Sequence, residues 1–128
     1  LIRSVVEGVC YHLRWFAETE EKKLKISDSV RFVGGGALSY ATCQILADVL
    51  NKRVETVDKP QNVGAVGAAV VIAVGLGEIN SFSEAKKLIP AVKVYEPNPA
   101  NREVYDKMYA VFKRLYKSNK QNFAALNG

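Results

Sequence analysis

The chain has 128 residues, 48% of them hydrophobic and 24% charged, and a formal net charge of +5 at pH 7. This length and composition are those of one globular domain. The longest weakly polar run, residues 63–76, is shorter than the roughly 20 residues that a membrane-spanning helix needs, so we expect no membrane contact. Much of the positive charge lies beside an apolar stripe near the end of the chain, without an aromatic-and-basic RNA motif, so we expect no nucleic-acid partner.

In the first half of the chain, apolar residues at three- and four-residue spacing predict a helix over residues 2–20. A short apolar run at residues 30–33 predicts a strand, and three glycines follow it directly. Residues 40–50 have the pattern of a second helix, for which Ser39 is a suitable N-cap. Alternating residues at 54–57 predict another short strand.

In the second half, a helix is expected over residues 63–74, and its Gly and Ala residues make one side very small. We interpret it as a packed interior helix. A short helix over 81–88, capped by Ser81 or Ser83, and an extended segment over 92–99 follow. The last helix, over 100–123, carries an aromatic stripe that is typical of a core or an interface.

The two cysteines, Cys10 and Cys43, lie in apolar helical surroundings. This pattern favours buried thiols in a reducing cytosol over a disulfide, and therefore a cytoplasmic protein. His12 is the only histidine, and one His with two distant Cys has poor spacing for a metal site, so we expect no metal site and a structural role for His12. No motif around Asp28 or Asp48 marks a general base.

The order strand, glycine turn, helix around Gly34, Gly35 and Gly36 is the geometry by which α/β proteins hold nucleotides. The glycine turn is not a dinucleotide fingerprint, because Ser39 stands where the third glycine is needed, and no Walker lysine follows it. A nicotinamide-binding unit with Glu55 on the ribose remains one alternative. A turn that serves only tight packing is another.

Four blocks of sequence, in the right order and with the right gaps, resemble the carboxyl-terminal domain of the FGGY carbohydrate kinases: residues 31–39, 44–50, 54–55 and 64–69. The helix at the start and the tyrosine-bearing tail also resemble that family. The resemblance implies an α/β fold, helix-rich with short strands, that is part of an actin/hexokinase-like (ribonuclease H-like) ATPase domain. Residues 1–128 would form the carboxyl-terminal portion of the kinase's ATP-binding domain.

The same resemblance implies transfer of the γ-phosphoryl group of ATP to a sugar hydroxyl, with Mg²⁺, in a full-length enzyme. The adenosine-binding residues would be Gly34, Gly35, Gly36 and Ala37, together with Ser39 and Tyr40. In the family, the catalytic Asp and the first phosphate loop lie upstream of Arg3, and an amino-terminal domain binds the sugar. We therefore expect no kinase activity from this chain alone, and self-association through its exposed apolar surface.

A second interpretation is a non-catalytic regulatory or scaffold protein with the same actin-like fold. Leu38 and Thr42 differ from the residues usual in the family at those positions, and they favour this alternative. Binding of ATP or ADP distinguishes the two interpretations.

Overall fold

A three-stranded sheet at the centre of the molecule brings the loops that follow its parallel strands to one edge. The computed structural model describes residues 1–127, without the side chains of residues 85 and 86. Within this range, three strands form one sheet in the order β1 (Ser29–Arg31), β2 (Arg53–Val57), β3 (Ala91–Tyr95). β1 and β2 are parallel, with Val30 opposite Val54, whereas β3 runs antiparallel to β2. Parallel neighbours need a crossover, and helix α2 (Tyr40–Leu50) supplies it.

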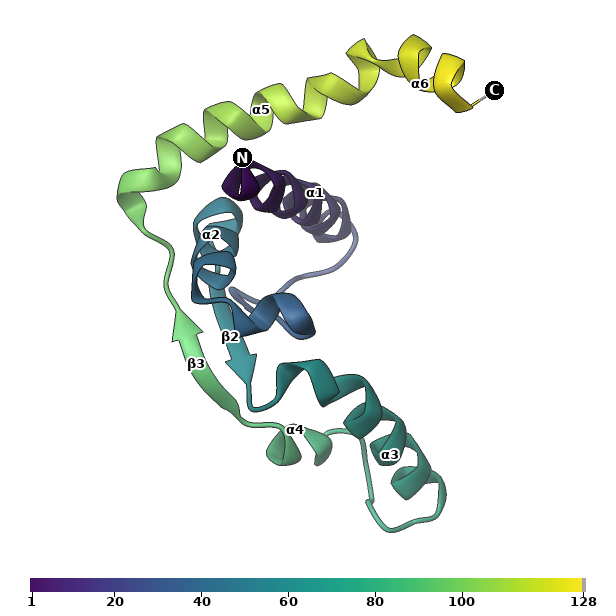
Figure 1. Ribbon diagram of the computed structural model, residues 1–128. Helices are drawn as coiled ribbons and strands as arrows, with labels where there is room; N and C mark the ends of the chain where they lie inside the picture. Colours follow the sequence, from purple (N-terminus) through teal and green to yellow (C-terminus); the bar gives the residue numbers. More distant parts are fainter. Residues whose placement is uncertain (128) are drawn as a thin grey trace.

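Three helices pack together on the core. Figure 1 shows α1 (Ile2–Glu21) lying between α2 and the long helix α5 (Arg102–Ser118). α2 packs on β2 and β3, and α1 and α5 pack against α2 and against each other, so the periodic apolar residues of the helices meet as their spacing predicts. The core cluster contains Cys10, Tyr11, Cys43, Leu46, Ala47, Val49, Val54, Tyr95, Tyr105 and Tyr109.

Helix α3 (Val63–Gly75) does not pack as the sequence predicted. It lies at the opposite end of the molecule from α5 (Figure 1), and within residues 1–127 Val70 is its one buried residue. Val71 and Ile72 are 58% and 62% exposed. A Cβ atom placed on Gly64 or Gly67 would meet nothing within 4 Å. The interior position is therefore wrong for this chain, because no described segment approaches the small side of α3.

Two predicted helices have different limits in the structure. The helix expected over 81–88 is only α4 (Ala85–Leu88). Neither Ser81 nor Ser83 caps it, and their hydroxyl groups hydrogen-bond to each other (2.7 Å between the oxygens). The last helix begins at Arg102, after a 3₁₀ turn at Pro99–Asn101, and it stops at Ser118. Asn119 donates from its backbone and its side chain to the Leu115 carbonyl, and α6 (Lys120–Asn127) begins beyond it.

Candidate nucleotide site

The glycine turn lies at the carboxyl ends of the two parallel strands. After β1 the chain reaches Gly34, which has φ 91° and ψ −176°. The N–H of Gly34 donates to the Pro60 carbonyl oxygen (2.8 Å), and Pro60 lies in the loop after β2. Ligands of α/β sheets bind outside the carboxyl ends of parallel strands, so this pair of loops stands where a nucleotide would be expected.

The three glycines of the turn differ in how far the fold restricts each position. Gly34 has a backbone conformation that only glycine adopts readily. A Cβ on Gly36 would lie 3.0 Å from Cζ of Phe32, so a side chain there would require the Phe32 ring to shift. Gly35 is exposed, has no positive φ, and a Cβ would meet nothing within 4 Å. The described fold therefore accounts for Gly34 and Gly36, but it does not require glycine at position 35.

The start of α2 is fixed as the sequence predicted. A short 3₁₀ helix, η1 (Gly35–Leu38), leads to Ser39, whose hydroxyl oxygen accepts from the N–H of Thr42 (3.3 Å). Ser39 is thus the N-cap of α2. Ala37 is buried, and its carbonyl oxygen accepts from the Cys43 thiol at 3.6 Å. Ala37 is thus the buried residue of the turn, whereas Gly35, Gly36, Leu38, Ser39 and Tyr40 are exposed.

A cavity of about 230 Å³ opens beside the turn. Its walls come from the turn, from the loop after β2 and from β3, and they include Leu38, Tyr40, Lys59 and Lys93. The ring of Tyr40 is tilted against that of the buried Tyr95, with centroids 5.4 Å apart. Of the predicted residues, Ala37 and Tyr40 line this cavity, whereas Gly34, Gly35, Gly36 and Ser39 belong to the same turn but do not line it.

Asp48 is a positioning residue of the site that the sequence did not identify. It is 5% exposed, and its carboxylate accepts from the Gln44 side chain (2.9 Å), the N–H of Asn98 (2.8 Å) and the Asn101 side-chain amide (2.8 Å). These bonds fasten α2 to the connection between β3 and α5. No local motif marks this network, because two of its three donors lie about fifty residues away along the chain.

The remaining candidates have other surroundings. Glu55 lies on β2, two residues before the strand ends. Its carboxylate forms an ion pair with the guanidinium of Arg31 on β1, at 3.7 Å. Cys10 and Cys43 are both free and buried, as expected. Burial raises the pKa of the Cys10 thiol to about 11. Among the described residues no group of three or more His, Cys, Asp and Glu side chains could hold a metal ion.

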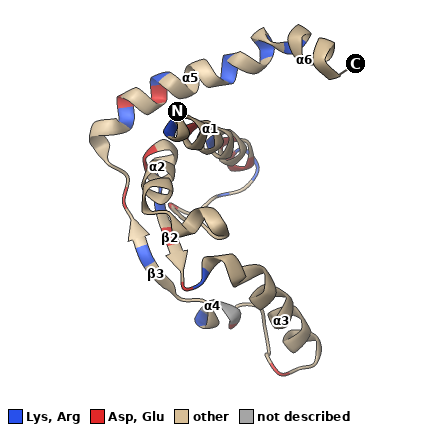
Figure 2. Ribbon diagram, viewed as in Figure 1, with Lys and Arg blue, Asp and Glu red and all other residues tan. Residues whose placement is uncertain are grey.

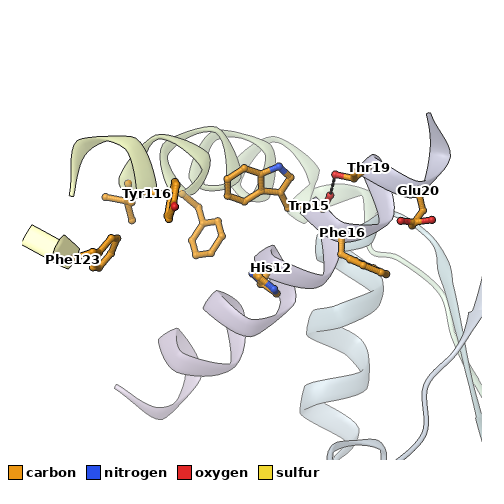
Figure 3. A pocket seen from close by; sticks show the side chains of 9 residues that line it. His12, Trp15, Phe16, Thr19, Glu20, Tyr116 and Phe123 are labelled. Atoms are coloured by element: carbon orange, nitrogen blue, oxygen red, sulfur yellow. Dashed lines mark hydrogen bonds between the residues drawn. The ribbon is translucent and has the colours of Figure 1, made fainter. Parts of the chain in front are cut away.

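His12, for which a structural role was expected, is exposed. It lines an apolar groove of about 630 Å³ between α1 and the α5–α6 segment, with Trp15, Phe16, Tyr116 and Phe123 (Figure 3). The aromatic stripe of the last helix is thus divided. Tyr105 and Tyr109 reach the core, and Tyr116 is 59% exposed.

Charge and hydrophobicity are unevenly placed along the chain. Figure 2 shows that α3 carries no charged residue, whereas α5 carries several lysines and arginines. Part of the charge joins helices to each other: Arg14 of α1 lies 2.8 Å from the Asp106 carboxylate of α5. None of the helices in residues 1–127 combines the length and hydrophobicity that a membrane span requires.

Known proteins are similar to this chain in sequence and in fold. Residues 1–76 match the family described as FGGY family of carbohydrate kinases, C-terminal domain. Xylulose kinase from Staphylococcus epidermidis (strain RP62A) is 31% identical over 125 residues, which are 97% of this chain and 25% of that protein. The chain therefore spans about a quarter of the length of the curated relatives it matches.

Solved structures give the same result. The ligand-bound xylulose kinase from Lactobacillus acidophilus superposes with a TM-score of 0.84 at 25% identity, over 97% of this chain and 25% of that one. The xylulose kinase from Rhodospirillum rubrum superposes with a TM-score of 0.77 at 28% identity, over 95% of this chain and 25% of that one. These matches confirm the resemblance seen in the sequence and the expected helix-rich fold of the actin/hexokinase-like sugar kinases. The chain belongs to the FGGY family of carbohydrate kinases, and its residues 1–76 match the C-terminal domain of that family.

Proposed function

We propose that the chain supplies the adenosine-binding side of the ATP site of a sugar kinase similar to xylulose kinase. The observation that carries this proposal is the hydrogen bond from Gly34 to Pro60, which holds the two loops at the carboxyl ends of β1 and β2 together. The family match and the names of the relatives support a kinase that phosphorylates a sugar hydroxyl. The parent enzyme would then take part in xylose metabolism.

The residues of the glycine turn fit a nucleotide. The space beside the Cα of Gly35 is open. Because glycine has no side chain, a ligand can approach the backbone there more closely than it could at any other residue type. Ser39 keeps the start of α2 in place through its cap, and Tyr40 presents an exposed ring at the cavity mouth. We assign adenosine contact to Gly34, Gly35, Gly36, Ala37, Ser39 and Tyr40.

The phosphoryl transfer itself is assigned to the longer parent enzyme. When bound, Mg-ATP would supply the γ-phosphoryl group, and its Mg²⁺ would neutralise the charge that develops during the transfer. The residues of this chain would bind and orient the nucleotide, and we assign no catalytic base and no Mg²⁺ ligand among them. We expect no sugar-dependent release of ADP from the chain alone. Turnover well above a blank in a coupled assay would contradict this division.

We place the parent enzyme in the cytoplasm. The two buried free thiols support this proposal, because reduced cysteines are typical of cytosolic proteins. The exposed apolar residues of α3 support a further proposal, that the chain forms homo-oligomers when it is alone.

Nuclear magnetic resonance of the ¹⁵N-labelled chain tests the proposed site. Addition of ADP is expected to shift the backbone amide signals of Gly35, Gly36 and Tyr40, and to leave the signal of Gly8 in α1 unchanged. Shifts confined to the groove around Trp15, or no shift at saturating ADP, would contradict the proposal.

A further inference from the structure

The cavity beside the glycine turn contains two lysines that the proposed function has not used. Lys59 comes from the loop after β2, and Lys93 comes from β3. At about 230 Å³ the cavity is smaller than the roughly 300 Å³ at which sites for whole drug-sized ligands begin. It therefore suits one part of a nucleotide and not the complete molecule. The inference that follows rests on the proposed function.

Lys59 is held in an unusual backbone conformation next to the turn. Its φ of 44° and ψ of 57° place it in the left-handed region, where residues other than glycine are uncommon. The N–H of Asn62 donates to its carbonyl oxygen (2.8 Å), and the next residue, Pro60, accepts the bond from Gly34. Strained residues of this kind are frequent at ligand-binding loops. The position of Lys59 is thus fixed by the same loop contact that positions the glycines.

Lys93 reaches the same cavity from the other side. It pairs with Thr56 across the antiparallel ladder of β2 and β3. Burial raises the pKa of the Cys43 thiol, and the positive charge of Lys93 acts against this rise, so its ammonium group lies within electrostatic reach of the first turn of α2. The same thiol donates to the Ala37 carbonyl oxygen at 3.6 Å. Lys93 therefore lies close to the turn as well as to the strand.

The charges in the cavity lining leave it positive. Asp58 is the one acidic residue that lines it in the described part of the chain, against the two lysines. Among the ion pairs of the described residues, none joins Lys59 or Lys93 to a carboxylate, so their ammonium groups are not neutralised by one. Lysine ammonium groups bind phosphate as point charges. We propose that Lys59 and Lys93 bind phosphate oxygens of the nucleotide whose adenosine lies against the glycine turn.

Calorimetric titration of the 128-residue chain with ADP and with uncharged adenosine tests this assignment. Lys59→Gln and Lys93→Gln are each expected to weaken ADP binding by about fivefold, the strength of one charge pair near 4 Å in water. Adenosine binding is expected to stay unchanged in both variants. Lys107→Gln, on the exposed side of α5, removes the same charge far from the cavity and is expected to change neither affinity.

A chemical readout keeps the test independent of affinity. ADP is expected to protect Lys59 and Lys93 from acetylation, as measured by mass spectrometry, whereas adenosine is expected to leave them reactive. Unchanged ADP affinity in both lysine variants, with ADP still bound, would overturn the inference but keep the proposed function. Equal loss of ADP and adenosine binding would also overturn it. Failure of the unsubstituted chain to bind either ligand would overturn the proposed function itself, and the inference with it.

Discussion

The amide N–H of Gly34 lies 2.8 Å from the carbonyl oxygen of Pro60, and this bond joins the loop after β1 to the loop after β2. The two residues are 26 positions apart in sequence, yet parallel pairing of the strands brings their loops to one edge of the sheet. The geometry of the candidate site therefore depends on Gly34 keeping its φ of 91°.

Gly34→Ala is expected to destabilise the chain by about 2 kcal/mol, because φ 91° with ψ −176° is nearly inaccessible to a residue with a Cβ. Gly35→Ala is the matched control, since its Cβ meets nothing and its φ is unstrained. Urea unfolding followed by circular dichroism measures both. Equal unfolding midpoints for the two variants would contradict the conformational account of Gly34.

Asp48→Ala is expected to destabilise the chain by about 3 kcal/mol, because it leaves the Asn98 amide and the Asn101 side chain without their acceptor. Asp28→Ala, at an exposed position, is the control and is expected to have little effect. Urea unfolding again gives the comparison. A loss for Asp48→Ala no larger than that for Asp28→Ala would show that the carboxylate does not fasten α2 to the β3–α5 connection.

Alkaline pH is expected to unfold the chain through its buried tyrosines. Burial raises the pKa of Tyr11 to about 12, and it also raises the pKa of Tyr105 and Tyr109 above the ordinary value of 10. A raised pKa in the folded state means that the stabilisation is complete below pH 10 and is lost as the pH rises through the folded-state values. The part of the tyrosinate absorbance that comes from the buried tyrosines is expected to change together with the circular dichroism, in one transition above pH 10. Ionisation of all tyrosines near pH 10 with the fold intact would contradict this.

Self-association is expected to occur through α3. Its apolar residues, among them Ile72 at 62% exposed, form a surface without charged residues, and such surfaces drive association. Light scattering at micromolar concentration is expected to show dimers or larger species, and Ile72→Glu is expected to reduce them. Leu126→Glu makes the same change at an exposed residue of α6 and is expected to leave the association intact. A monomer in the unsubstituted chain would contradict the prediction.

Local patterns predicted the parts of the fold that depend on local physics. The apolar spacing around Val5 and Leu13 predicted α1, and the hydroxyl of Ser39 predicted where α2 begins. Both predictions succeed because periodicity and capping act within a few residues. The sequence did not predict the Asp48 network, whose donors are distant, or the break at Asn119, where one side chain competes with the helix backbone.

The candidate site was predicted at the level of its segment but not of its individual glycines. A run of three glycines does not show that φ requires glycine at position 34, that the Phe32 ring crowds position 36, or that neither restriction applies at position 35. The interior position predicted for α3 was wrong because small residues indicate close packing without indicating whether the partner lies within the described chain. The three-dimensional neighbours of each glycine and of α3 are needed to decide between these possibilities.

Titration calorimetry with ADP tests the central claim most directly, with the unsubstituted chain, Gly35→Val and Gly8→Ala compared side by side. Position 35 accepts a Cβ without contact, so Gly35→Val changes the surface that a ligand meets while the Phe32 packing at Gly36 stays intact. Binding by the unsubstituted chain and by Gly8→Ala, with loss in Gly35→Val, is the predicted result. No binding by the unsubstituted chain, or equal binding by all three proteins, would contradict the assignment of the glycine turn as the adenosine site.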